Sequence, residues 1–381
     1  MHTEINRAAL AAAKRVVIKI GSRVLVQRTG RPDTRRMREL VRQIALLHRS
    51  GHEVIVVTSG AVGAGMEALS MKTRPATLPD LQMAAAVGQS RLMAAYDAFF
   101  GRHGILIGQI LLTHDDLNHR VRHLNARNTI LNLLENRIVP IVNENDVVAV
   151  DEIKFGDNDL LASLVAIMME AHALVLLTTV DGFRLPMANG RTRRASTLEG
   201  VDEKTLSHAV GKGSEISTGG MASKLKSAGM ALSTGIPVVI ADGRRDDIIT
   251  GVIRGDDAGT FIKPADVDAK GGIPQRKRWI AFFHKTRGTL TVDQGAAAAL
   301  CQKGRSLLAA GIKRIDGDFG TGTVVNIVTE DGRTIARGLT GYSSADIQKI
   351  MGRKTADIAS LLGARDYDEV IHRDNMVILD A

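Results

Sequence analysis

Cysteine, aromatic residues and long apolar runs are all scarce in this chain of 381 residues. Cys301 is the only cysteine, which excludes an intrachain disulfide and a zinc site built on cysteines. Aromatic residues make up only 3%, so the core has to be built mainly from aliphatic side chains and Met. No apolar run is long enough to span a membrane, and the patch at Ala8–Ala13 is too short for a signal peptide. We therefore expect a cytoplasmic protein without a membrane segment.

Two further absences concern binding to anions. No block of five like charges occurs, so a basic tail for nucleic acid is not supported. The glycine spacings of the P-loop and of the dinucleotide-binding fold are missing as well. The formal net charge is nevertheless +9. That charge favours nucleotides, acidic metabolites or nucleic acid as partners, although an ordinary solvated basic surface explains it equally well.

Short apolar runs and helical patterns alternate along the chain to about residue 262. The expected strands are Val16–Ile20, Val54–Val57, Ile105–Leu112, Ile138–Val142, Ala173–Leu177, Pro237–Ile240 and Gly259–Ile262. The expected helices are residues 34–50, residues 80–100, Leu117–Asn136, Leu160–Ala171, residues 204–210 and Ala222–Leu232. This alternation predicts an α/β domain over residues 1–262, with a mostly parallel sheet sandwiched by helices.

The composition and the apolar pattern of the sequence change beyond residue 262. Residues 263–275 are rich in Pro, Gly, Asp and Lys, which is typical of a linker. Residues 276–381 then predict a small β-rich domain, either α+β or barrel-like. Its expected strands and helices are Trp279–Phe283, Gly288–Val292, Gln294–Lys303, Gly322–Val328, Thr334–Gly338 and Ser344–Ile350.

Two polar clusters follow closely on a buried strand of the first domain. The run Ile138–Val142 ends in Asn143–Asp146, and Gly156–Asp159 follows a short apolar patch. Open parallel sheets present ligand-binding groups at the carboxyl ends of their strands. A pair of Asx-rich turns is the structural alternative. Because the clusters lie so close together, we favour a binding site.

Charged and glycine-rich positions at other strand ends indicate a site for phosphate. Lys19 lies inside an apolar strand, where a lysine has to form an ion pair, extend its ammonium group to solvent or take part in a functional site. Gly21, just beyond the strand, lets the backbone approach a phosphate closely. The loop Thr58–Gly65 contains Ser59 and is a candidate substrate loop, although its small residues could serve helix packing alone. The run from Thr218 precedes a helix whose free N–H groups favour an anion.

The order of these motifs along the chain is more specific than any one of them. The motifs are Val16–Ser22, Val57–Ala61, Ala86–Arg91, Leu124–Arg127, Val142–Asp146, Gly156–Asp159 and Thr218–Lys224. The ordered set resembles the glutamate 5-kinase family of the amino-acid kinases, over nearly the whole chain. The C-terminal part, closing with His372–Met376, resembles the PUA domain that bacterial members of that family carry.

This resemblance implies the amino-acid kinase fold followed by a PUA-like domain, and a transferase that consumes ATP with Mg²⁺. The implied reaction is phosphorylation of the γ-carboxylate of L-glutamate to γ-glutamyl phosphate, the first step of L-proline biosynthesis. It further implies feedback inhibition by proline, transfer of the labile product to γ-glutamyl phosphate reductase, and a homo-oligomer.

The resemblance also implies roles for individual residues. Lys19 would contact the phosphoryl group in transfer, Lys224 the ATP phosphates, and Asp159 would orient both lysines. Gly21 and Gly60 would supply backbone N–H donors. Glutamate would be bound by Ser59, Asp146 and Asn158, with Asp146 as the partner of the ammonium group. The nucleotide would be bound by Lys19, Thr178, Thr179, Thr218, Gly219, Gly220, Met221, Ala222, Ser223 and Lys224. No metal-binding residue is predicted.

Two departures from the family pattern concern the nucleotide side. The chain has Thr178-Thr179 where the family usually has Thr-Asp, and Gly213–Ser217 replaces a loop richer in glycine. Other amino-acid kinases, such as acetylglutamate or aspartate kinases, are the nearest alternative, but they do not normally carry a PUA domain. A protein that binds or modifies RNA through its PUA-like domain is the alternative from another class.

Overall fold

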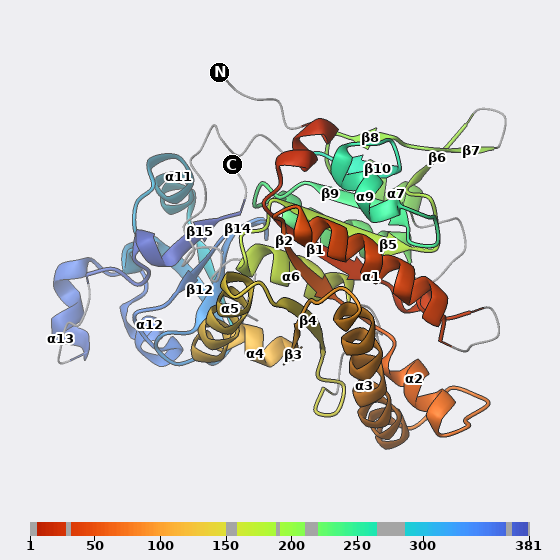
Figure 1. Ribbon diagram of the computed structural model, residues 1–381. Coiled ribbons are helices and arrows are strands. Elements are labelled where there is room, and N and C mark those ends of the chain that lie inside the picture. The colour runs from red at the N-terminus through yellow and green to blue at the C-terminus, as the bar shows by residue number, and fades with distance from the viewer. Residues whose placement is uncertain are drawn as a thin grey trace. The chain divides into compact units, whose positions relative to one another are not determined.

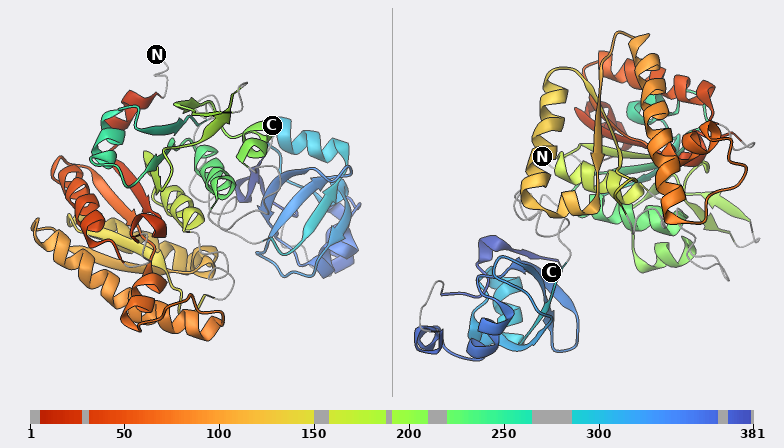
Figure 2. Two further views of the ribbon diagram at one scale, coloured as in Figure 1. Left: turned by 90° about the vertical axis from the view of Figure 1, so that its right-hand side faces the viewer. Right: turned by 90° about the horizontal axis from the view of Figure 1, so that it is seen from below.

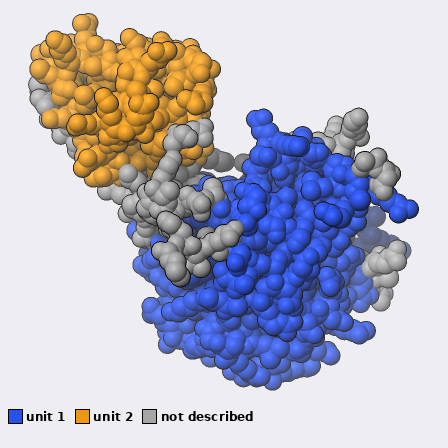
Figure 3. Space-filling view, turned by 90° about the horizontal axis from the view of Figure 1, so that it is seen from above, with its two compact units in different colours: residues 1–272 blue, residues 273–381 orange. Residues whose placement is uncertain are grey.

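The computed structural model describes residues 6–27, 32–149, 158–187, 191–209, 220–264, 286–362 and 368–379. The chain forms two compact units, residues 1–272 and 273–381, which Figure 3 colours blue and orange. Most of the expected linker, from residue 265 onward, lies outside the described residues, as does the expected strand Trp279–Phe283. The boundaries 1–262 and 276–381 therefore stay predictions.

The sequence predicted a mostly parallel sheet for the first unit, and the unit is built on such a sheet, with eight strands. The strand order is β3-β4-β2-β1-β5-β9-β10-β8, and every pairing is parallel except that of β9 with β10 (Figure 1). The strands are β1 (Arg15–Ile20), β2 (Glu53–Val57), β3 (Ile107–Leu112), β4 (Val139–Glu144), β5 (Ala173–Thr178), β8 (Thr197–Leu198), β9 (Val238–Asp242) and β10 (Gly259–Ile262). A separate hairpin joins β6 (Arg184–Pro186) to β7 (Thr192–Arg194).

Helices cover both faces of this sheet (Figure 2). They are η1 (Arg7–Ala12), η2 (Ser22–Val24), α1 (Thr34–Arg49), α2 (Ala61–Ala68), α3 (Leu78–Gly101), α4 (His114–Asn118), α5 (Arg120–Glu135), α6 (Asp159–Met168), α7 (Glu203–Ala209), α8 (Met221–Leu232) and α9 (Ile248–Arg254). Asp33 caps α1, because its carboxylate accepts a hydrogen bond from the Arg36 N–H at 2.9 Å. In the described ranges, no helix combines the length and apolar character needed to cross a membrane.

The central strand β1 shows how the sequence places a charge at the site. Val16, Ile18 and Ile20 belong to the core that includes Leu40 and Ile44 of α1. Because successive side chains of a strand alternate between the two faces, Lys19 points to the other face, where α6 packs against β1. Both faces of the strand are buried, which is typical of a parallel sheet.

Several elements differ from the sequence prediction. The residues expected to form the loop Thr58–Gly65 instead begin the helix α2 at Ala61. The single helix expected over Leu117–Asn136 is divided into α4 and α5, because His119 between them has an extended backbone, with φ −86° and ψ 112°. The hairpin β6–β7 and the two-residue β8 were missed, because strands this short carry almost no apolar pattern.

The helix α2 forms in spite of its glycines because it packs very closely on α3. A methyl group added at Gly65 would lie 1.7 Å from the Ala84 carbonyl oxygen, and one added at Gly88 would lie 1.8 Å from the Ala61 carbonyl oxygen. Only hydrogen fits at these two positions. Gly65, the last residue of the expected loop, therefore serves helix packing, and tertiary packing overrides the poor helix propensity of glycine.

Replacing Gly88 with Ala should lower the free energy of unfolding by about 1–3 kcal/mol or more, because the backbones of α2 and α3 would have to separate. The measurement is urea unfolding followed by circular dichroism. Gly229→Ala is the matched control: Gly229 is also helical, but a Cβ there meets nothing within 4 Å. That variant should be neutral or stabilised by about 0.5–1 kcal/mol. Equal stability of the two variants would contradict the close contact.

The second unit is the small β-rich domain that the sequence predicted. Its five-stranded sheet has the order β12-β11-β13-β14-β15. The elements are β11 (Thr289–Val292), α11 (Gln294–Lys303), η4 (Ala309–Gly311), β12 (Ile312–Asp316), β13 (Val324–Thr329), β14 (Thr334–Leu339), α12 (Ser344–Ile350), η5 (Thr355–Asp357), α13 (Ile358–Leu362), η6 (Arg373–Asn375) and β15 (Met376–Ile378). The edge strands β12 and β15 were missed, because β12 is mostly exposed and charged and β15 is only three residues long.

Candidate active site

A buried carboxylate joins two buried lysines at the centre of the first unit. One oxygen of Asp159 lies 2.6 Å from the Lys19 Nζ, and the other lies 2.6 Å from the Lys224 Nζ. Asp159 is fully buried, and the lysines are only 3% and 6% exposed. The structure therefore brings together the three residues expected to form the catalytic group, with Asp159 between the lysines as expected.

Three elements far apart in sequence position this cluster. Lys19 lies near the carboxyl end of β1, Asp159 is the first residue of α6, and Lys224 lies in the first turn of α8. A carboxylate in a first turn is favoured by the helix dipole. One turn further along α6, the Ser163 hydroxyl donates to the Ser227 carbonyl of α8 at 2.7 Å. The two helices are thus fixed side by side, with the lysines on either side of Asp159.

Gly21 serves this site differently from the expectation. Its N–H donates to the Leu177 carbonyl of β5 at 3.1 Å, so this donor is already engaged within the protein. A Cβ at Gly21 would lie 3.0 Å from the same carbonyl and 3.9 Å from the Lys19 Nζ. Glycine here allows β1 and β5 to approach each other at the lysine. Gly60 has a left-handed backbone, with φ +103°, and turns the chain from β2 into α2.

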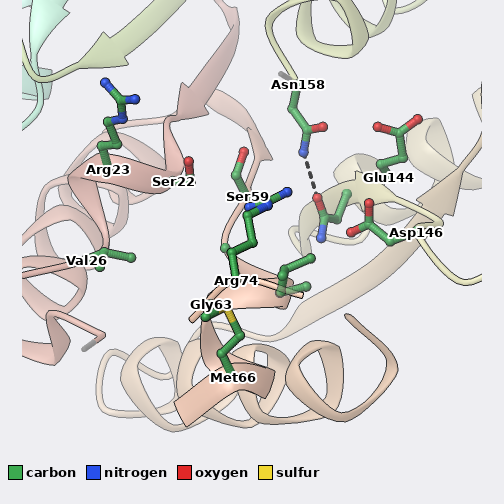
Figure 4. Close-up of a pocket in the computed structure, with 14 residues that line it drawn as sticks. Ser22, Arg23, Val26, Ser59, Gly63, Met66, Arg74, Glu144, Asp146 and Asn158 are labelled. Carbon is green, nitrogen blue, oxygen red and sulfur yellow. Dashed lines mark hydrogen bonds between the residues drawn. The ribbon is translucent and has the colours of Figure 1, made fainter. Parts of the chain in front are cut away.

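A pocket of about 330 Å³ opens at the same edge of the sheet (Figure 4). This volume is at the small end of the range for ligand sites, which suits a small metabolite. The lining residues are Ser22, Arg23, Val26, Ser59, Gly60, Ala61, Val62, Gly63, Met66, Arg74, Asn143, Glu144, Asp146 and Asn158. The three residues expected to bind glutamate are all among them. Asn158 connects the pocket to the lysine cluster, because it directly precedes Asp159.

The pocket holds groups of both charges. Burial raises the pKa of Asp146 to about 6, although the nearby positive charge of Arg74 opposes that rise. Within the described part of the chain, neither Asp146 nor Arg74 makes a hydrogen bond or an ion pair. A carboxylate and a guanidinium that both face one small pocket match a ligand that carries an ammonium and a carboxylate.

The residues expected on the nucleotide side are placed only in part. Thr178 ends β5, and its carbonyl accepts from the Gly243 N–H at 2.9 Å. The Thr179 carbonyl accepts from the guanidinium of Arg244, which is also paired with Asp242. Gly220 caps α8, and Met221, Ala222, Ser223 and Lys224 form its first turn. Thr218, Gly219 and the unusual loop Gly213–Ser217 lie outside the described residues.

Sequence reasoning missed two basic residues of the pocket. Arg23 follows β1, and Arg74 precedes α3; both are exposed. Nothing in the sequence marks them among the other basic residues, since only folding brings them to this pocket. Asn143 and Glu144 did stand out, as members of the first polar cluster, but neither was assigned a role.

The lysine cluster equips this site to stabilise negative charge. The lysines and the N-terminus of α8 place positive charge beside a pocket for a small charged ligand. Within the described ranges, no group of three or more His, Cys, Asp or Glu side chains could hold a metal ion. Both Asp159 oxygens face lysines, so the described side chains of this cluster offer no dedicated cage for Mg²⁺.

Family comparison agrees with this arrangement. The model of the amino acid kinase family matches residues 14–242, and that of the PUA domain matches residues 288–362. The chain therefore belongs to the amino acid kinase family and carries a PUA domain.

Within that family, the chain is similar to proteins named glutamate 5-kinase over nearly its whole length. The protein from Moorella thermoacetica is 46% identical over 375 residues, which are 98% of each chain. The protein from Syntrophus aciditrophicus is 43% identical over 378 residues, covering 99% of this chain and 97% of its own. The protein from Citrifermentans bemidjiense is 44% identical over 379 residues, which cover 98% of this chain and 100% of its own. The resemblance noted in the sequence is confirmed.

Proposed function

We propose that this protein is an enzyme that transfers the γ-phosphoryl group of ATP to the γ-carboxylate of L-glutamate. The observation that carries the proposal is the Lys19–Asp159–Lys224 cluster beside a pocket with both charges. Full-length similarity to glutamate 5-kinases supports the choice of substrate. A main function in RNA binding is not favoured, because these relatives match the chain from end to end.

The reaction needs no general base, because the γ-carboxylate of glutamate is already ionised at neutral pH. A carboxylate oxygen attacks the γ-phosphorus, the bond from that phosphorus to the β,γ-bridging oxygen breaks, and ADP leaves. Catalysis then consists of aligning two anions and stabilising the charge that spreads over the phosphoryl oxygens. Lys19 and Lys224 supply that charge, and Asp159 holds their ammonium groups in place. Mg²⁺ would accompany ATP and would help to neutralise the charge of its phosphates, while Lys19, Lys224 and Asp159 act as described.

The wider role follows from the same proposal. The product, γ-glutamyl phosphate, is a labile acyl phosphate that γ-glutamyl phosphate reductase consumes on the way to proline. We extend the proposal to a cytoplasmic homo-oligomer that is inhibited by proline. Residues 1–262 would carry the chemistry, with residues 263–275 as the linker to the PUA domain.

Trapping of the product tests the reaction. With ATP, glutamate and hydroxylamine, the protein should form ADP and γ-glutamyl hydroxamate in equal amounts. Aspartate and N-acetylglutamate are the matched alternatives, since they belong to other amino-acid kinases. Equal or faster turnover with either would overturn the substrate assignment. ADP formation without any hydroxamate would overturn the acyl-phosphate product.

Recognition of the glutamate ammonium by Asp146 predicts a pH dependence. The pKa of Asp146 is about 6, so this carboxyl is ionised above pH 6 and becomes neutral below it. Between pH 8 and pH 5 the kcat/KM for glutamate should therefore be level at first and then fall about tenfold per pH unit below pH 6. Asp146→Asn should bind glutamate about ten- to a hundredfold more weakly, without this acid limb. An identical acid limb in both proteins would assign the titration to another group.

Recognition of the glutamate α-carboxylate is expected to involve Arg74. Arg74→Ala should lower kcat/KM for glutamate by about tenfold, because a charge-assisted hydrogen bond is lost. The comparison substrate is 4-aminobutyrate, which equals glutamate without its α-carboxylate. Its kcat/KM should be the same in both proteins, since it offers Arg74 nothing to bind. A parallel loss with both substrates would show that Arg74 supports the pocket in some other way.

A further inference from the structure

Three side-chain amides form a chain that leads away from the pocket. The Asn158 Nδ2 donates to the Asn143 Oδ1 at 2.7 Å, and the Asn143 Nδ2 donates to the Gln89 Oε1 at 2.8 Å. Asn158 and Asn143 line the pocket, whereas Gln89 lies behind them on α3. The first of these hydrogen bonds is the dashed line in Figure 4. Gln89 belongs to the motif Ala86–Arg91.

A backbone carbonyl fixes the direction of this chain. The Asn158 Nδ2 also donates to the Thr58 carbonyl at 2.6 Å. A carbonyl can only accept, so the nitrogen of Asn158 has to face it. Thr58 is itself held by β4, through its N–H to the Val142 carbonyl at 2.9 Å, and by α3, through its hydroxyl to the Tyr96 hydroxyl at 2.8 Å. The acceptor is therefore stationary.

The orientation of Asn158 decides what it presents to a ligand. Its two N–H groups are used by Thr58 and Asn143, so the group left for the pocket is its carbonyl oxygen, Oδ1. An oxygen in the same pocket as the Asp146 carboxylate suits an ammonium group. If Asn143 turned its amide over, two nitrogens would face each other, and the orientation of Asn158 would depend on the Thr58 carbonyl alone. The Gln89 oxygen prevents this, because it accepts from the Asn143 nitrogen.

Two further observations agree with a role for the Gln89 oxygen. The Gln89 Nε2 is buried and has no hydrogen-bond partner within the described residues. A buried N–H without a partner is costly, and an apolar side chain would avoid that cost. Gln89 also follows Gly88, whose close contact with Ala61 fixes α3 at this point. The Gln89 oxygen is thus held in place by its hydrogen bond with Asn143, while the Gln89 nitrogen has no hydrogen-bond partner among the described residues.

We infer that Gln89 is a positioning residue that acts through Asn143 to keep the Asn158 carbonyl oxygen directed at the ammonium group of the substrate. The inference rests on the proposed function, since it takes glutamate as the ligand. The helix α3 contributes no side chain to the pocket lining. Through Gln89 it would nevertheless help the pocket to bind an amino acid in preference to a simple dicarboxylate.

Calorimetric titration of the full-length protein with glutamate and with glutarate tests this inference. Glutarate keeps both carboxylates of glutamate and lacks only the ammonium group. Gln89→Met keeps the length of the side chain and removes the acceptor, whereas Gln89→Glu keeps an acceptor oxygen. Gln89→Met should weaken glutamate binding about tenfold and leave glutarate binding within about twofold. Gln89→Glu should bind glutamate within about threefold of the wild type.

Each other outcome has a defined meaning. Unchanged glutamate binding by a folded Gln89→Met protein overturns the inference, and so does an equal loss for glutamate and glutarate. If Gln89→Met does not fold, Gln89→Asn removes the same hydrogen bond by shortening the side chain by one methylene. A wild-type protein that binds glutamate without phosphorylating it overturns the proposed function but leaves this inference intact. A wild-type protein that does not bind glutamate overturns both.

Discussion

Asp159→Asn is expected to lower kcat by at least about 100-fold and to cost about 3–5 kcal/mol in the free energy of unfolding. The wild-type carboxylate lies 2.6 Å from each of two buried ammonium groups. Asparagine keeps the shape of the side chain but leaves these positive charges buried, close together and without a counter-charge. Breaking a buried ion pair on one side is costly because the remaining charge has lost both water and its partner. Hydroxamate formation and urea unfolding measure the two effects.

Asp159→Glu separates charge from position. It retains the negative charge, so its stability should lie nearer to that of the wild type. It moves the carboxylate by one methylene, so kcat should still fall strongly, since displacing a catalytic group by about 1 Å is enough to do so. Wild-type kcat in Asp159→Asn would remove Asp159 from the catalytic group and leave it a purely structural residue.

Lys19→Met and Lys224→Met are each expected to lower kcat by roughly 10²- to 10³-fold. Methionine keeps most of the apolar stem, so the variant lacks mainly the charge. The charge matters most while the phosphoryl group is in transfer, and kcat should therefore suffer far more than the KM for glutamate. Steady-state kinetics with both substrates varied give the two parameters separately.

Lys226→Ala is the matched control for the lysine variants. Lys226 lies on the same helix, α8, but is exposed to solvent, whereas Lys224 is only 6% exposed. Its loss should leave kcat within about twofold of the wild type. A similar loss in Lys224→Met and Lys226→Ala would indicate a general effect of positive charge on α8 and not a catalytic contact. A raised KM with unchanged kcat in Lys19→Met would place Lys19 in ground-state binding.

The sequence marks Lys19 and Asp159 as candidate site residues because a charged side chain is unfavourable in a buried segment. Lys19 stands within an apolar strand, and the polar run ending in Asp159 follows a strand that has to be buried. The meeting of these residues with Lys224 required the family resemblance, since local patterns do not specify contacts over 205 residues of chain. The parallel sheet was predictable for a related reason: strands buried on both faces form continuous apolar runs.

Other features could not be predicted because they depend on tertiary contact alone. The glycines of α2 lower its helix propensity, and only the packing against α3 explains the helix. Arg23 and Arg74 resemble any other exposed arginines until the fold brings them to one pocket. The engagement of the Gly21 N–H with Leu177 likewise depends on the pairing of β1 with β5.

The place of β1 in the sheet has a consequence for synthesis on the ribosome. One neighbour of β1 is β2, which begins at Glu53, but the other is β5, which begins at Ala173. During translation, a central strand with the apolar run Val16–Ile20 therefore keeps one hydrogen-bonding edge unpaired until more than 150 further residues have emerged. Unpaired apolar edges promote self-association of nascent chains. We expect the yield of native protein to depend on translation rate and on chaperones that shield this edge, more strongly than the stability of the finished fold would indicate.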